Sequence, residues 1–167
     1  MASDKVEYVA AAAATITLAS LATSATWVAG RESSVIDNTT NKYLDYHVSG
    51  KITVGTSPTA NTEIRVYAFS LIDDTNYPDV MDGTDSDETW TSAGVRDGCA
   101  RLLGVIPVDS TTSDRSYPFG KWSVAAAFGG FCPPKFGLFI THNTGVNLNA
   151  TAGNHAVNVS GLYETVA

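Results

Sequence analysis

The sequence has few charged side chains and few basic ones. Charged residues fill 16% of the 167 positions, whereas soluble domains average about 25%. Because long surface helices rely on Lys, Glu and Arg, this shortage disfavours a helical bundle. Nucleic-acid-binding modules need clustered basic residues, yet the chain has 10 Lys and Arg against 17 Asp and Glu, a formal net charge of −7. We therefore expect no nucleic acid among its partners.

Cysteine is also scarce, and long hydrophobic runs are missing. Cys99 and Cys132 do not form a CxxC motif, so neither zinc binding nor thiol redox chemistry is indicated. One bridge between them would suit a secreted domain, but we expect two reduced thiols that pack as small core residues. The uncharged stretch over residues 9–30 is Ala- and Thr-rich, and no net positive charge precedes it. We therefore expect neither a signal peptide nor a membrane anchor, and no membrane partner.

Small polar residues and aromatic residues take the place of the missing charges. The chain holds 20 Thr, 15 Ser and 9 Asn, together with six Phe, seven Tyr and three Trp. With 44% apolar residues the chain can bury a core, so its composition argues against disorder. The composition and length predict one acidic, β-rich domain.

Alternation of apolar and polar residues predicts the strands. Residues 43–54 alternate with Gly50 as the only gap on the apolar side, and residues 63–71 are rich in β-branched and aromatic side chains. The turn-forming segment between them, residues 55–61, predicts that the two strands pair as a hairpin. Further strands are expected over residues 15–19, 26–30, 102–108, 136–142 and 156–166.

Few helices are expected. Residues 121–128 favour one short helix that ends at Gly129 and Gly130. Residues 1–14 form an N-terminal arm, for which a helix, a strand and a tether all remain open. Residues 15–167 are predicted to form a single domain, an all-β antiparallel sandwich of jelly-roll type with seven or eight strands.

An acidic stretch over residues 73–88 contains no Lys or Arg. Clustered carboxylates on a loop supply the oxygen ligands that Ca²⁺ takes, but the spacing does not match an EF-hand loop. The alternative is a solvated loop that repels like charges or meets a basic partner, and we assign no metal ligand. The carboxylates are those of Asp73, Asp74, Asp79, Asp82, Asp85, Asp87 and Glu88.

The histidines and tryptophans allow two further interpretations. The three histidines lack the HxH or HxxxH spacing of a zinc site, so we expect hydrogen-bonding or surface histidines. Two of them flank residues 143–154 and would lie close together if their strands paired. The tryptophans lie in or beside predicted loops, where a glycan-binding face would place stacking platforms, although buried aromatics are commoner. These residues are His47, His142 and His155, and Trp27, Trp90 and Trp122.

Motifs of catalysis are missing from the sequence. It has no GxSxG elbow, and the GVRDG segment at residues 94–98 lacks the Lys-Ser/Thr ending of a phosphate-binding loop. No pair of carboxylates stands out as a glycosidase pair. We expect no enzyme, no catalytic residues and no cofactor.

Three stretches resemble small virion proteins of tailed bacteriophages and together cover about half of the chain. They are residues 17–41 (TLASLATSATWVAGRESSVIDNTTN), 48–69 (VSGKITVGTSPTANTEIRVYAF) and 136–167 (FGLFITHNTGVNLNATAGNHAVNVSGLYETVA). Within these proteins the chain is most similar to head decoration, or cement, proteins. That resemblance implies a jelly-roll β-sandwich, and it carries over no catalytic residues.

The resemblance also implies a location and a set of partners. The protein would bind the lattice of the major capsid protein on the capsid exterior, after synthesis in the cytoplasm of the host bacterium. It would self-associate as a homotrimer, which matches local three-fold positions of an icosahedral shell. The low charge suits this role, because few Lys and Glu side chains need to be ordered on association. The alternatives are a tail or neck component, or a glycan- or receptor-binding module of a fibre.

Overall fold

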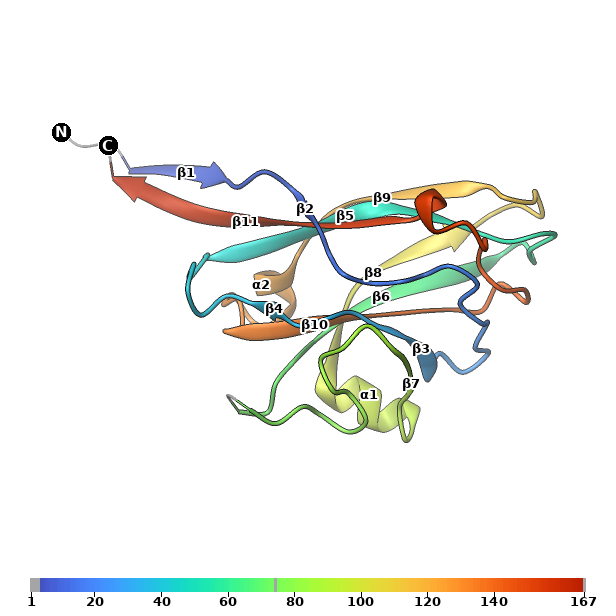
Figure 1. The fold of residues 1–167 in the computed structure, drawn as a ribbon, viewed down its shortest axis with the longest axis horizontal. Helices are drawn as coiled ribbons and strands as arrows, with labels where there is room; N and C mark the ends of the chain where they lie inside the picture. Colours follow the sequence, from blue (N-terminus) through green and yellow to red (C-terminus); the bar gives the residue numbers. More distant parts are fainter. Residues whose placement is uncertain (1–3, 74, 167) are drawn as a thin grey trace.

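The chain forms two antiparallel sheets that pack face to face in a computed structural model, which describes residues 4–73 and 75–166 (Figure 1). Sheet A contains, in spatial order, β1 (Asp4–Tyr8), β11 (Ala156–Val166), β5 (Asp45–Thr53) and β9 (Ser116–Ser123), with β2 (Ala12–Ala13) also beside β11. Sheet B contains β7 (Asp87–Thr89), β3 (Ala29–Glu32), β10 (Lys135–His142), β6 (Thr62–Ser70) and β8 (Ala100–Val108), with β4 (Ile36–Asp37) also beside β10. The helical segments are α1 (Ala93–Cys99), α2 (Val124–Ala127) and a 3-10 turn, Ala152–Asn154.

The connections between strands follow jelly-roll topology. The chain crosses from one sheet to the other at each step from β2 to β3, β4 to β5, β5 to β6, β8 to β9, β9 to β10 and β10 to β11. The link from β6 to β8 instead joins two neighbours in sheet B. Counting β1 with β2 and β3 with β4 as interrupted strands, and leaving out the short β7, gives the eight strands of a jelly roll. The predicted all-β sandwich of jelly-roll type is confirmed.

The predicted hairpin of residues 43–54 and 63–71 is wrong in its pairing. Both strands exist, but β5 pairs with β11 and β9, whereas β6 pairs with β10 and β8. Their apolar sides face each other across the sandwich, and Val48, Ile52 and Ile64 lie in one core cluster. Alternation identifies the buried side of a strand, but it does not say whether the next strand lies beside it or opposite it.

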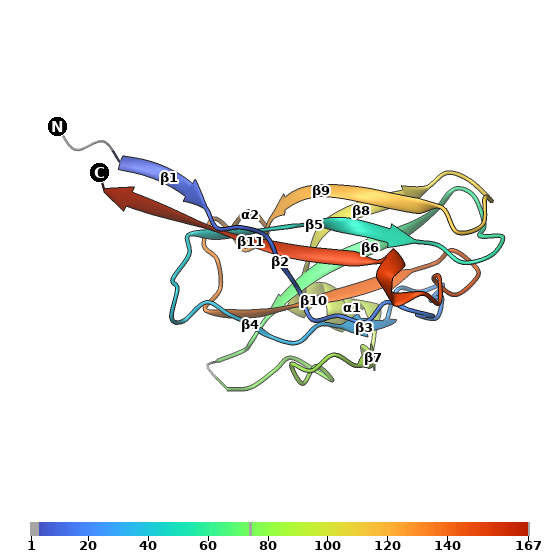
Figure 2. The ribbon, with the colours of Figure 1, turned by 45° about the horizontal axis from the view of Figure 1, so that its top comes forward.

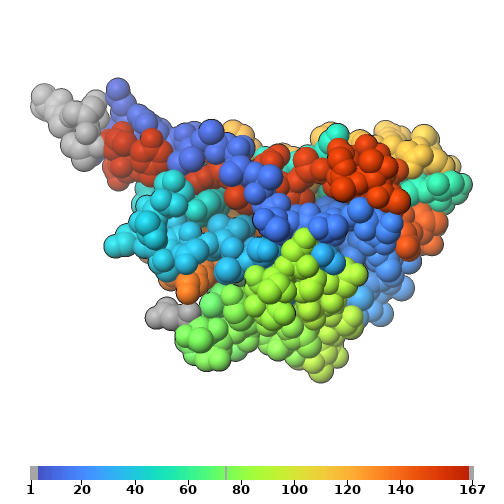
Figure 3. Space-filling model, in the orientation of Figure 1, coloured from blue at the N-terminus to red at the C-terminus, as the bar shows by residue number. Residues whose placement is uncertain are grey.

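Sheet B is covered on both faces. Its inner face contributes Val66 and Leu138 to the core between the sheets. Its outer face carries Tyr67, Phe69 and Phe139, which pack with Met81 and Trp90 in a second core cluster. Met81 and Trp90 belong to the long connection from β6 to β8, which contains β7 and α1 and folds against sheet B (Figure 3). This connection is therefore a third layer and not a solvated loop.

The expected helix over residues 121–128 is present only as α2, because residues 121–123 complete β9 beside β5. The Ser123 hydroxyl caps α2 by accepting a hydrogen bond from the Ala126 N–H at 2.9 Å. Asp45 accepts the Ala125 N–H at 2.7 Å. After the helix the chain turns at Gly129, whose φ of 81° suits glycine.

Helix α1 was not predicted, because its two glycines are poor helix formers. Ser92 caps it by accepting the Val95 N–H at 3.2 Å. Arg96 is buried and donates to the Trp27 carbonyl at 2.7 Å, which ties the helix to the loop before β3. The GVRDG segment at residues 94–98 therefore lies within a packed helix.

The N-terminal arm adopts strand structure in its described part. β1 and β2 both pair antiparallel with β11 of the same chain. β1 and the end of β11 project together from the body of the sandwich (Figures 1 and 2). Residues 1–3 of the arm lie outside the described residues.

Candidate functional site

The acidic stretch over residues 73–88 is held to the rest of the fold by Asp85. Its carboxylate accepts hydrogen bonds from Arg31 Nε at 2.6 Å and from the Thr17 N–H and hydroxyl at 2.9 and 2.6 Å. Burial raises the pKa of the Asp85 carboxyl, but the hydrogen bonds from Arg31 and Thr17 outweigh it and hold that pKa below its ordinary value. Arg31 also contacts Asp87 at 3.1 Å. These carboxylates stabilise the fold.

Three more carboxylates of the stretch each accept a backbone N–H together with a side-chain donor from the same residue. For Asp73 and Asp82 the partner lies three and two residues along the chain, which is the usual role of Asp in turns. For Asp79 the partner lies twelve residues away, so this bond joins two separate parts of the connection. The pairs are Asp73 with Asn76, Asp79 with Thr91, and Asp82 with Thr84. Asp74 lies outside the described residues.

A buried carboxylate that the sequence did not single out lies beneath this stretch. Glu32 of β3 has no exposed surface and accepts the Gly83 N–H at 2.7 Å and the Asp82 N–H at 3.1 Å. Burial raises the pKa of Glu32 to about 7. Oxygen atoms of Glu32, Asp82 and Glu88 lie within 4.8 Å of one another. A single Glu in a short strand carries no spacing pattern, so only the fold brings these three groups together.

The histidines are distributed over separate environments. His142 is buried in sheet B, where Nε2 donates to the Leu21 carbonyl at 3.0 Å and Nδ1 contacts the Thr144 hydroxyl. Burial lowers the pKa of His142 to about 4. His155 precedes β11 in sheet A and contacts the Asn149 carbonyl at 2.9 Å. The two strands do not pair with each other, and both rings serve as structural hydrogen-bonding groups.

His47 lies on the outer side of β5. Its Nε2 is 3.3 Å from Asp45 Oδ2, and its ring packs against Tyr8 with ring centroids 5.4 Å apart. Its Nδ1 is buried and has no hydrogen-bond partner among the residues that the structure describes. His47 therefore anchors the arm at the point where β1 reaches the body.

The tryptophans do not form an exposed stacking platform. Trp90 is 1% exposed and packs edge-on against Phe69 and Phe139 in the second core cluster. Trp27 is covered by the Arg65 guanidinium, which lies 3.8 Å from its ring centroid. Trp122 stacks on Phe119 at 4.9 Å. All three contribute to packing, which disfavours the glycan-binding interpretation.

Both cysteines are free thiols, as the composition suggested. Cys132 packs against the main core, and burial raises the pKa of its thiol to about 12. Cys99 packs against the second core cluster. A thiol with a raised pKa is a poor nucleophile at neutral pH, so Cys132 is suited to packing.

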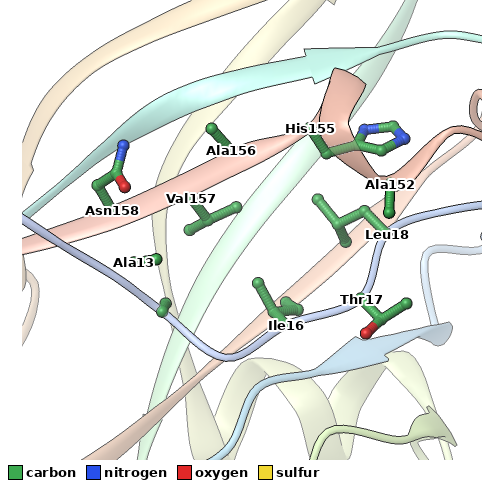
Figure 4. Close-up of a pocket in the computed structure, with 10 residues that line it drawn as sticks. Ala13, Ile16, Thr17, Leu18, Ala152, His155, Ala156, Val157 and Asn158 are labelled. Atoms are coloured by element: carbon green, nitrogen blue, oxygen red, sulfur yellow. The ribbon is translucent and has the colours of Figure 1, made fainter.

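A hollow of about 220 Å³ lies where the chain crosses from β2 toward sheet B (Figure 4). Ala13, Ile16, Leu18 and Val157 supply apolar walls, and His155 lies at one end. Both ring nitrogens of His155 are already engaged within the chain. The hollow therefore offers an apolar depression without a free acid or base.

An exposed apolar surface lies where β6 ends and β10 begins. Ile72 is 71% exposed and Phe131 is 83% exposed, unusually high fractions for large apolar side chains. Hollows of about 240 and 310 Å³ adjoin Leu71 and Ile72, one beside Pro133 and Pro134 and the other beside Phe128. We call this the Ile72–Phe131 surface. Leu71 and Ile72 line the two hollows with Phe128, Pro133 and Pro134, and Phe131 belongs to the loop that precedes these prolines.

Sequence reasoning missed the Ile72–Phe131 surface, although one signal was present. Phe131 follows two glycines and precedes Pro133 and Pro134, a context that keeps an aromatic residue in a loop. Among the described residues, no helix is long and apolar enough to cross a membrane. Comparison of the chain with protein-family models, with curated proteins and with solved structures finds no match.

Proposed function

We propose that the protein is a non-enzymatic structural protein of a bacteriophage virion, which binds the assembled capsid from outside and stabilises it as a head decoration protein. The Ile72–Phe131 surface carries the proposal. Large apolar side chains that stay exposed beside hollows, as Ile72 does, mark surfaces that contact other proteins. In this proposal the occupant is the lattice of the major capsid protein, which presents the same contact many times.

Three further observations support this role. Jelly-roll sandwiches are used by viral capsid proteins, although lectins and cupins share the architecture, so the fold alone does not decide. The carboxylates, histidines and cysteines described above are engaged in packing and hydrogen bonding. The stretches that resemble phage virion proteins add the phage context.

The mechanism is linkage between binding and assembly. A protein that binds the assembled lattice but not its dissociated subunits shifts the equilibrium toward the assembled shell. Association as a homotrimer would present three copies of the contact to a local three-fold position. Simultaneous contacts raise the overall affinity of such an assembly without new chemistry.

Binding to purified expanded capsids tests the proposal. The wild-type chain is expected to bind capsids and to raise their survival of heat and low salt, whereas F131S and I72T are expected to bind more weakly. L44T is the matched control, because Leu44 is 53% exposed and lies outside the Ile72–Phe131 surface. Failure of the wild-type chain to bind, with equal survival of particles that lack it, would overturn the proposal. Labelling at the tail or neck in electron micrographs would instead assign it to those parts.

A further inference from the structure

β1 forms an open edge of sheet A. All five of its residues are exposed, and among the described strands only β11 pairs with it. β5 contacts β11 only as far as Leu162, opposite Asp45. Beyond that point the sheet is a two-stranded ribbon that projects from the body (Figures 1 and 2). A two-stranded ribbon is marginally stable in water, and an open strand edge is a template for another strand.

Backbone hydrogen bonds show which residues of β1 face the open edge. The Val9 N–H donates to the Gly161 carbonyl at 2.9 Å, so alternate residues of β1, counted back from Val9, bond to β11. Leu162 of β11 lies opposite Tyr8, and its carbonyl accepts the Leu44 N–H at 2.7 Å. The backbone groups of Leu162 therefore point away from β1. The residues whose N–H and C=O groups point to the open edge are therefore Asp4, Val6 and Tyr8.

The charges of β1 are complementary to those of a second β1. Lys5 and Glu7 lie on one side of the strand, with Val6 between them. If two antiparallel copies meet with Val6 opposite the partner's Val6, then Lys5 lies opposite the partner's Glu7. A shift of the two-fold axis by one residue pairs Lys5 with the partner's Lys5, or Glu7 with the partner's Glu7, and like charges directly opposite each other are destabilising.

The same alignment also lets backbone hydrogen bonds form between the two strands. It places each outward-pointing residue of β1 opposite an outward-pointing residue of the other copy, which is the condition for paired N–H and C=O groups in an antiparallel ladder. The ribbon projects from the body, and each β1 enters its own body beyond Tyr8. The two bodies would therefore lie at opposite ends of the joint.

We propose that a second copy of this chain binds the open edge of β1, related by a two-fold axis at Val6, and joins the two copies of sheet A into one continuous sheet. The contact is isologous, because the same strand serves both copies. One short strand from each copy buries less than the roughly 1,000 Å² of a stable interface, so the association is weak and reversible. On a lattice it would link neighbouring copies or neighbouring trimers.

Sedimentation equilibrium of the purified chain tests this without a capsid, so its outcome is independent of the proposed function. The mass of the wild-type chain is expected to double, relative to the species present at high dilution, as concentration rises from about 10 μM to about 1 mM. K5E places Glu opposite Glu, and E7K places Lys opposite Lys, so each variant alone is expected to lose the doubling. A mixture of K5E and E7K restores opposite charges and is expected to recover it.

A proline variant and a charge control complete the test. V6P removes an N–H that points to the open edge and spares the bonds to β11, so V6P is expected to lose the doubling and keep its melting temperature. E164K reverses an exposed charge on β11 of the same ribbon and is expected to associate like the wild-type chain. Absence of doubling in the wild-type chain, or no recovery in the mixture of K5E and E7K, would overturn the proposal.

Discussion

The Arg31 guanidinium and the Asp85 carboxylate form a partly buried ion pair, with Nε 2.6 Å from Oδ1. Arg31 belongs to β3, and Asp85 belongs to the long connection that covers the outer face of sheet B. The same carboxylate accepts two hydrogen bonds from Thr17, in the segment that crosses between the sheets. One carboxylate therefore joins three parts of the chain.

Replacing Asp85 should destabilise the fold more than replacing Asp87. D85N is expected to lower the free energy of unfolding by about 1–3 kcal/mol, because a hydrogen-bonded charge is lost from a site where the Asp85 side chain is 17% exposed. D87N is the control, since the Asp87 side chain is 72% exposed and surface ion pairs contribute at most about 1 kcal/mol. Urea unfolding of both variants measures the difference, and equal losses would contradict the role given to Asp85.

Glu32 should make stability fall as pH rises. Its pKa is about 7 in the folded chain, against an ordinary value of 4.5, so its contribution is fully present below pH 4.5 and lost as pH rises through 7. E32Q does not titrate. The stability of E32Q relative to the wild-type chain is therefore expected to rise by up to about 3 kcal/mol between these pH values. D82N removes a neighbouring negative charge that also raises the pKa of Glu32, so D82N is expected to lose part of the wild-type slope, but less of it than E32Q.

His142 should make stability fall as pH decreases, which is the opposite of the effect of Glu32. Its pKa is about 4 in the folded chain and 6.5 in an ordinary environment, so the unfolded chain takes up the proton first and stability is lost as pH falls from 6.5 to 4. Between pH 4.5 and 6.5 this slope offsets that of Glu32. H142N is therefore expected to show a steeper loss of stability with rising pH than the wild-type chain. Equal slopes in urea unfolding across this range would contradict the assignment.

Replacing Trp90 should destabilise the protein strongly. W90A is expected to cost about 3–5 kcal/mol, because it leaves a cavity between Phe69 and Phe139 in the second core cluster. W27A is expected to cost less, since Trp27 is only half-buried beneath Arg65. Chemical denaturation distinguishes the two variants. A W90A protein as stable as the wild-type chain would show that the second core cluster contributes little.

Calcium should have no effect on melting. The oxygens of Glu32 already accept the N–H groups of Asp82 and Gly83, and burial favours the protonated form of Glu32. We expect the same melting temperature in added Ca²⁺ and in excess chelator. A rise with Ca²⁺ that E32Q abolishes would instead identify Glu32, Asp82 and Glu88 as a cation site.

Much of the strand content could be predicted from sequence, because alternation depends only on which side of a strand is buried. Residues 43–54 contain β5, and residues 136–142 include all of β10 except Lys135. The pairing of residues 43–54 with residues 63–71 could not be predicted, since facing and adjacent strands have the same alternation. Helix α1 was missed because a cap at Ser92 and contacts of the buried Arg96 outweigh two glycines.

The low content of charged residues is evident from the sequence, and it correctly excluded a helical bundle in favour of an all-β sandwich. The sequence by itself also determined where the acidic residues gather. Only the tertiary structure decided what they do, because hydrogen bonds from Arg31 and Thr17 come from positions far along the chain. The exposure of Phe131 and the open edge of β1 were likewise decided by packing, which selects the apolar side chains that remain in contact with solvent.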